Sequence, residues 1–287
     1  MVYFNYSSEE IKQVKKWLSI LLASVCGMAF GSEIVCGEQR FSGHLQGIAA
    51  DDTGIYWSFV DTVVKTDCAG KMTASVTVPR HAGDLCAADG LIYVSVCYYD
   101  KADIKRDGDT GWVYVYNDKL EFLRKIALPD TRRPDGITFC NGTFYVAGDD
   151  FGKTLHRENS IRVYSADWRY LRSVTVDIGT PTHYGAQTLN AVGGRILAGF
   201  YTKRQPNAVL LSVPELKPEG TFPVPVSFGF AVIPKKFSGN RELYMVARTT
   251  GNRKNGTAGG KVVIYEMRDG KYVPAEWNLP ANNPQKR

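Results

Sequence analysis

The chain has 287 residues, of which 44% are hydrophobic and 22% charged, enough for one large domain with a sizeable buried core. The formal net charge is +6, but the Lys and Arg residues are scattered along the sequence, which disfavours a nucleic-acid-binding protein. The 28 glycines and the 12% aromatic content favour many strands joined by tight turns.

Residues 1–31 are predicted to be an export signal peptide. Lys12, Lys15 and Lys16 precede an apolar run that is too short to span a bilayer and ends at Phe30. Small residues then suit cleavage before Ser32. We therefore expect an exported protein, periplasmic, extracellular or on the outer surface, with no membrane span.

Two alternatives to a cleaved signal remain for this segment. It can form a buried N-terminal helix, or Cys26 can be the acylated residue of a lipoprotein, although Val25 stands where a lipoprotein signal needs a small residue. In each case residues 32–287 are expected to form a single domain.

The cysteines do not indicate a metal centre or a disulfide framework. Five remain after residue 31, an odd number that cannot all pair, and none has the CxxC spacing of a structural zinc site. Cys86 and Cys140 lie in apolar strands and are predicted to be small buried side chains. At most one or two disulfides fit, and their pairing is open.

A pattern of four strands recurs five times after residue 44. Its phase is clearest in the second strand of each unit, and the units follow one another at roughly 37 to 52 residues. These second strands are Ile55–Ser58, Ile92–Ser95, Phe144–Ala147, Ile196–Gly199 and Leu243–Val246. Asp89-Gly90, Asn141-Gly142 and Asp269-Gly270 are typical of hairpin turns between the strands.

The repeat predicts an all-β chain folded as a β-propeller of five four-stranded blades. The expected blades are 46–79, 83–129, 135–179, 185–226 and 228–280. Residues 33–42 are left over and can clasp the last blade as an extra or replacement outer strand. A β-sandwich and a β-helix are the alternatives, but a sandwich would not need five units of the same internal order.

Two segments carry a resemblance to known repeats. Gln46–Tyr56 (QGIAADDTGIY) and Asp135–Val146 (DGITFCNGTFYV) resemble NHL-type repeats and are similar to the repeats of the gluconolactonase- and regucalcin-like propellers. The resemblance covers about residues 44–280 as architecture. It implies the propeller fold and no particular reaction, because such motifs recur in propellers of unrelated function.

The repeat also predicts which residues reach the functional face. Loops that lead into the first strand of each blade, and loops between the second and third strands, open onto the same face of a propeller. The residues there that begin or precede the innermost strands are expected to border one central funnel. They are His44, Gln46, His81, Asp84, Arg133, Asp135, His183 and Gln187.

Two functions of different class follow from these side chains. The first is an exported binding propeller for a polar or anionic small molecule, a glycan or a protein segment, with Arg133 favouring an anionic group and rim aromatics accepting a sugar. The second is an exported hydrolase of glycan, lactone, ester or peptide that uses His and Asp residues of the same funnel. Such a hydrolase can use a divalent metal, held where His44, His81 and His183 converge. The alternative is that these polar side chains are solvated or cap backbone amides.

Overall fold

The computed structural model describes residues 31–37, 40–148, 157–203, 207–251 and 256–277. All but the last residue of the predicted export signal lie outside these ranges. Within them, no helix has the length and apolar character needed to cross a membrane.

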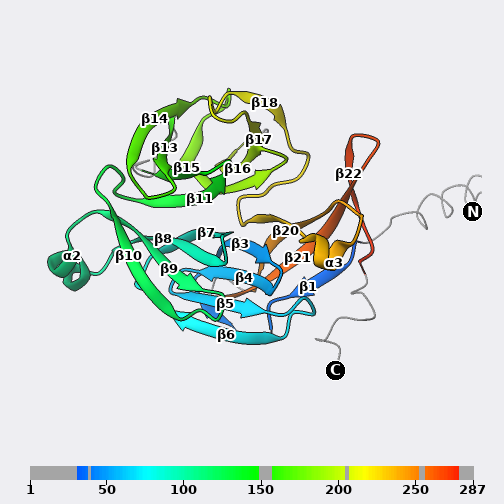
Figure 1. Ribbon diagram of the computed structural model, residues 1–287, viewed down its shortest axis with the longest axis horizontal. Helices are drawn as coiled ribbons and strands as arrows, with labels where there is room; N and C mark the ends of the chain where they lie inside the picture. Colours follow the sequence, from blue (N-terminus) through cyan, green and yellow to red (C-terminus); the bar gives the residue numbers. More distant parts are fainter. Residues whose placement is uncertain (1–30, 38–39, 149–156, 204–206, 252–255, 278–287) are drawn as a thin grey trace, which may run out of the picture.

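The described residues form five antiparallel blades in a ring, which confirms the predicted five-bladed β-propeller (Figure 1). Blade 1 contains β3 (Leu45–Asp51), β4 (Gly54–Phe59), β5 (Thr62–Thr66) and β6 (Met72–Thr77). Blade 2 contains β7 (Ala82–Ala88), β8 (Leu91–Cys97), β9 (Gly111–Asn117) and β10 (Phe122–Leu128). Blade 3 contains β11 (Pro134–Cys140), β12 (Thr143–Gly148), β13 (Asn159–Ser165) and β14 (Tyr170–Val176).

The last two blades follow the same order. Blade 4 contains β15 (Thr182–Val192), β16 (Arg195–Thr202), β17 (Ala208–Leu211) and β18 (Pro218–Thr221). Blade 5 contains β19 (Phe230–Val232), β20 (Leu243–Thr250), β21 (Thr257–Arg268) and β22 (Lys271–Pro274). The inner strands contact one another in the order β3, β7, β11, β15, β19 and back to β3, so the ring is closed.

The turn residues behave as their chemistry requires. Asp89, Asn141 and Asp269 all have positive φ, and each is followed by a glycine with positive φ. Asn and Asp tolerate this left-handed backbone better than other side chains, which is why such pairs favour tight hairpins. These three turns join β7 to β8, β11 to β12 and β21 to β22.

The hydrophobic core is divided into five clusters, each lying between two neighbouring blades. Successive side chains of a strand point to opposite faces of its sheet, so every blade serves two clusters. In β4, Trp57 packs towards blade 5 whereas Tyr56 packs towards blade 2. Cys86 and Cys140 are buried in clusters of this kind.

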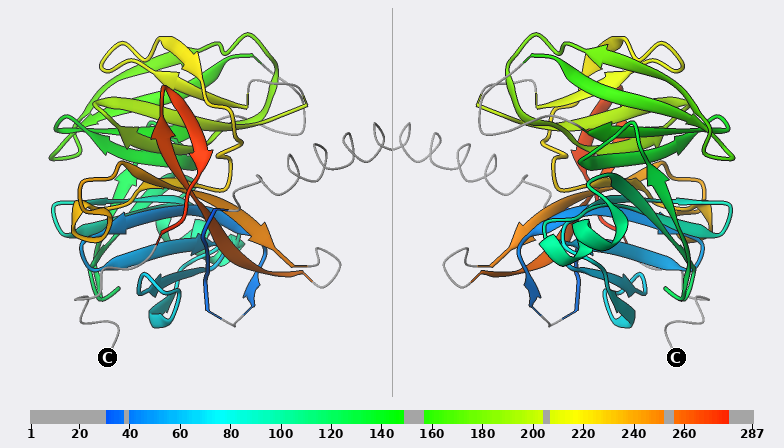
Figure 2. Two further views of the ribbon diagram at one scale, coloured as in Figure 1. Left: turned by 90° about the vertical axis from the view of Figure 1, so that its right-hand side faces the viewer. Right: turned by 90° about the vertical axis from the view of Figure 1, so that its left-hand side faces the viewer.

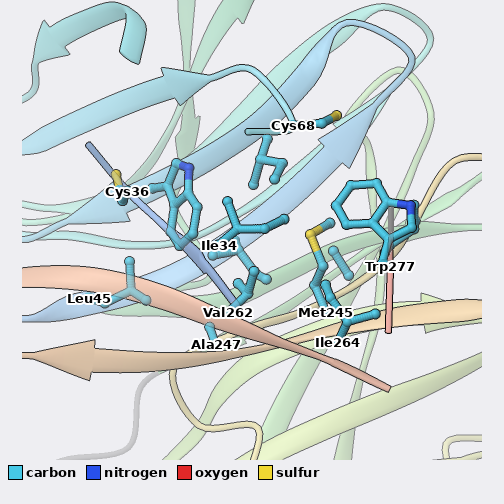
Figure 3. Packing of buried hydrophobic residues seen from close by; sticks show 14 of the residues in the cluster. Ile34, Cys36, Leu45, Cys68, Met245, Ala247, Val262, Ile264 and Trp277 are labelled. Carbon is cyan, nitrogen blue, oxygen red and sulfur yellow. The ribbon is translucent and has the colours of Figure 1, made fainter. Parts of the chain in front are cut away.

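The N-terminal segment completes the outer edge of blade 5. β1 (Glu33–Val35) pairs with β21 at Lys261–Val263, and β2 (Phe41–Ser42) pairs with it at Thr257–Ala258. In Figure 2 the dark blue N-terminal segment accordingly lies against the orange strands of blade 5. Ile34 and Cys36 then pack with Val262, Ile264 and Trp277 in the cluster between blades 5 and 1 (Figure 3).

Two short helices and two strand ends differ from the sequence expectation. α2 (Lys101–Asp107) follows β8, and α3 (Lys235–Ser238) follows β19. β18 ends at Thr221, before the predicted boundary at 226, and β22 ends at Pro274, before the predicted boundary at 280. α2 buries none of its side chains, so it has no apolar face that would have revealed its helical period.

Candidate functional site

The inner strands all begin on one face of the ring, which we call the funnel face. Loops from each outer strand to the next inner strand open onto this face, as do the loops between the second and third strands of a blade. Of the eight candidate residues, His44, His81 and Arg133 belong to the first set of loops, and the other five lie within an inner strand.

The funnel face contains a cavity of about 700 Å³. It lies off the ring axis, where the start of blade 1 meets blades 4 and 5. The residues that line it are Gly43, His44, His183, Tyr184, Tyr201, Thr249, Gly251, Gly256, Thr257 and Ala258. A volume of this size suits a small ligand, and imidazole, phenol and hydroxyl groups provide the polar contacts that orient one.

His44 is held beside two aromatic rings. Its Nε2 lies 3.5 Å from the Tyr201 hydroxyl oxygen, and its ring meets Phe228 edge-on at 6.1 Å between centroids. Tyr201 meets the same Phe228 ring at 5.9 Å. His44 precedes β3 in blade 1 and Tyr201 lies near the end of β16 in blade 4, so this wall of the cavity is made by residues 157 positions apart in the chain.

Gln46 and His81 form a pair next to the ring axis. The Gln46 Nε2 lies 2.8 Å from His81 Nε2, and the His81 ring packs on Tyr99 at 5.3 Å between centroids. Burial lowers the pKa of His81 to about 4, and electrostatic repulsion from His44 and Arg80 acts in the same direction. His81 is therefore neutral between pH 5 and 8, and its buried Nδ1 has no hydrogen-bond partner among the described residues.

Asp84 lies below this pair, in the middle of the inner strands, and is fully buried. Its Oδ2 accepts hydrogen bonds from the backbone amides of Leu189, at 2.9 Å, and Ile137, at 3.4 Å. Burial raises the pKa of Asp84 well above its usual value despite these bonds. Asp84 therefore links blade 2 to blades 3 and 4 and does not reach the cavity.

Asp135 and Gln187 form a second pair near the axis, between blades 3 and 4. The Gln187 Nε2 donates to Tyr184 O at 3.0 Å and lies 3.5 Å from Asp135 Oδ2. Arg133 is exposed on the loop before β11, and its charge acts on Cys97 and Tyr99. An exposed guanidinium at this rim can meet an anionic group that approaches the axis.

The structure thus divides the eight candidate residues into two groups. His44 and His183 line the cavity, and the other six are not among its lining residues. Thr249 and Thr257 also line the cavity but were not among the candidates. Thr249 lies on β20, opposite Gly260 of β21, and Thr257 lies opposite Ser42 of β2, a long-range pairing with no local signal in the sequence.

The part of the chain that the structure describes groups no metal ligands at this site, and its other cavities are smaller, one of about 350 Å³ lying on the outer strands of blades 1 and 2. Among the described residues, no three His, Cys, Asp or Glu side chains are grouped so that they could hold a metal ion, and His44, His81 and His183 do not converge. At the opposite end of the inner strands, residues of all five strands surround a smaller cavity of about 140 Å³, which is lined mainly by apolar residues.

The comparisons with known proteins agree with the fold. No family model matches the chain, and no curated protein matches it. The solved structure of glutaminyl cyclase from Myxococcus xanthus is similar with a TM-score of 0.52 at 12% identity, over 84% of this chain and 97% of that one. The bifunctional GH43-CE protein of Bacteroides eggerthii is similar with a TM-score of 0.56 at 10% identity, over 88% of this chain and 37% of that one. At these identities the likeness extends to the propeller fold alone.

Proposed function

We propose that this chain is an exported ligand-binding propeller that takes a small polar molecule, or one end of a larger one, into the cavity on its funnel face. The observation that carries the proposal is the lining of that cavity. His44, His183, Tyr184 and Tyr201 give it four rings, and each ring carries a group that can hydrogen-bond. Cavities with apolar walls and a few convergent polar groups are the usual form of a small-molecule site.

An unsatisfied polar atom in the wall supports the same proposal. The Thr249 hydroxyl oxygen is buried and has no hydrogen-bond partner among the described residues. Buried polar groups are nearly always hydrogen-bonded, because losing their contact with water costs about 1–3 kcal/mol. A bound ligand with a polar group would supply the missing partner.

The lining favours binding over hydrolysis. Glycoside hydrolysis needs two carboxyl groups that flank the bond to be cleaved. Among the described residues that line the cavity there is no Asp or Glu, and Asp84 is buried below it. A hydrolase would have to act through residues beside the cavity, such as Asp135 or His81.

The proposal also includes export and a distant relationship. The predicted cleavage point precedes Ser32, whose backbone amide donates to Ala275 O at 2.9 Å and whose hydroxyl accepts from the Trp277 amide at 2.8 Å. Cleavage there would leave this tether between the two ends of the domain intact. The motifs at Gln46–Tyr56 and Asp135–Val146 support distant membership of the NHL and gluconolactonase-like repeat superfamily.

The test is thermal unfolding of the purified protein with maltose, citrate and triglycine, one probe for each expected class of ligand. A ligand at about 100 times its Kd raises the free energy of unfolding by about 2.7 kcal/mol, which is a clear upward shift in Tm. We expect at least one probe to stabilise the wild type but not the double variant His44→Ala/His183→Ala.

Lys119→Ala is the control for this experiment, because Lys119 is exposed at the turn between β9 and β10, on the opposite face. It should respond to the probe as the wild type does. An equal response of the double variant, or no response of the wild type to any probe, would contradict binding in this cavity.

A further inference from the structure

An additional two-residue insertion distinguishes β15 from the other inner strands. In β3, Leu45 pairs with Phe59 and Gly47 with Ser58, so one extra residue is accommodated. In β15, His183 pairs with Tyr201 but the next partner pair is Ala186 with Phe200. Tyr184 and Gly185 therefore have no partner residues in β16, and a further shift follows between Ala186 and Thr188.

The backbone of this bulge is unusual for a bulky residue. Tyr184 has φ +61° and Gly185 has φ +71°. Glycine adopts this left-handed region at little cost, whereas the Cβ of a tyrosine makes it strained. Bulges of this kind re-aim side chains next to functional sites.

The bulge directs two rings to the cavity. His183 and Tyr184 both line it, with 6.2 Å between their ring centroids. Tyr184 is 43% exposed, so its ring gains little from burial in the fold. The fold thus holds a large aromatic ring in the open, on a backbone conformation that tyrosine disfavours.

The other lining residues indicate what this ring meets. Thr249 and Thr257 provide hydroxyl groups, His44 provides an imidazole, and no Lys, Arg, Asp or Glu stands among the described lining residues. A pyranose ring has an apolar C–H face that can lie on an aromatic ring and neutral hydroxyl groups that can bond to Thr and His.

We propose that Tyr184 is the stacking platform for a neutral pyranose sugar at the end of a glycan. This inference rests on the proposed ligand-binding function and assigns a ligand class to the same cavity. His183, Thr249 and Thr257 are the groups positioned to bond to the sugar hydroxyls. The two register shifts of β15, between His183 and Ala186 and between Ala186 and Thr188, position the Tyr184 ring at the cavity.

The experiment is saturation-transfer-difference NMR with the full chain and a panel of maltose, cellobiose, lactose and mannobiose. We expect at least one sugar to bind the wild type, and Tyr184→Ala to weaken its binding by up to about tenfold, as loss of an aromatic stacking contact does. Tyr184→Phe should bind as the wild type does, because it keeps the ring face.

Two further variants make the result specific. Tyr184→Asn also removes the ring, but Asn suits a left-handed backbone, so it should lose binding while keeping the wild-type Tm. Tyr170→Ala is the matched control, because Tyr170 is 42% exposed on β14 and does not line the cavity. It should bind the sugar unchanged.

The possible outcomes distinguish failure of the sugar platform from failure of the proposed ligand-binding function. Unchanged sugar binding by Tyr184→Asn would overturn the platform and leave a sugar site in place. If citrate or triglycine binds in a way that His44→Ala/His183→Ala abolishes and no sugar binds, the inference falls and the ligand-binding function stands. If no sugar, citrate or triglycine binds, both fall.

Discussion

The residues that immediately precede the first core side chain of each inner strand meet around the axis of the ring. Their equivalence follows from the pairing of each inner strand with its neighbour. They are Gly47, Asp84, Gly136, Thr188 and Gly229. A Cβ on Gly47 would overlap the Asp84 carboxyl. The Asp84 side chain therefore fits at the axis because the equivalent position of blade 1 is a glycine.

Asp84 should make the stability of the protein depend on pH, in a direction opposite to most carboxyls. The pKa of Asp84 is raised in the folded state. Its contribution to the free energy of unfolding is therefore fully present below the unfolded pKa, near 3.8, and is lost as pH rises through the folded pKa. In Asp84→Asn the side chain stays neutral. Between the unfolded and the folded pKa of Asp84, we expect the free energy of unfolding of the variant to rise relative to that of the wild type by about 1.4 kcal/mol per pH unit.

Free energies of unfolding in urea, measured for both proteins at pH 5, 6, 7 and 8, give this difference. The wild type and the variant must be compared with each other, because His81 also makes stability depend on pH. Its pKa is lowered to about 4, so its contribution to the free energy of unfolding is lost as pH falls below about 6.5. Its effect opposes that of Asp84 in the wild type and cancels in the difference. A difference that stays constant with pH would mean that Asp84 is ionised in the fold.

At the scale of single elements, β1 is a short strand whose two neighbouring side chains face opposite environments. Ile34 is 5% exposed and packs in the cluster between blades 5 and 1, whereas Val35 is 52% exposed. We expect Ile34→Ala to lower the free energy of unfolding by about 2–4 kcal/mol, because it leaves a cavity in that cluster. Val35→Ala should change it by about 0.5 kcal/mol or less.

Urea unfolding of the two variants tests whether β1 closes the ring in solution. Equally small effects would show that the segment is not docked on β21. Equally large effects would show that the strand is buried on both faces, contrary to its pairing and exposure here.

The elements that could be predicted are those set by local chemistry. Turn pairs such as Asn141-Gly142 and the alternating apolar residues of the second strands depend on nearby sequence only, and they gave the blade count and phase. The off-axis cavity could not be predicted, because it depends on the Tyr184-Gly185 bulge and on the pairing of β2 with β21. The full burial of Asp84 depends on β3, β11 and β15, which no single repeat reveals.

At the scale of the whole molecule, export remains the prediction with the widest consequences. The mass of the intact protein from the exported fraction of its native host should match a chain that starts near Ser32, because the signal is removed during export. A mature chain that retains Lys15 and Lys16 would contradict this prediction. A chain that begins at an acylated Cys26 would instead establish the lipoprotein alternative.

The tether between the two ends of the domain has a consequence for the order in which the protein is made. Ser32 and Trp277, which hydrogen-bond to each other, are 245 residues apart in the chain. On the ribosome, the first strand emerges long before the strand that it must join, so the ring cannot shut until synthesis of the domain is almost finished. The blades made first therefore wait in an open arc, and the last blade to be synthesised closes the ring.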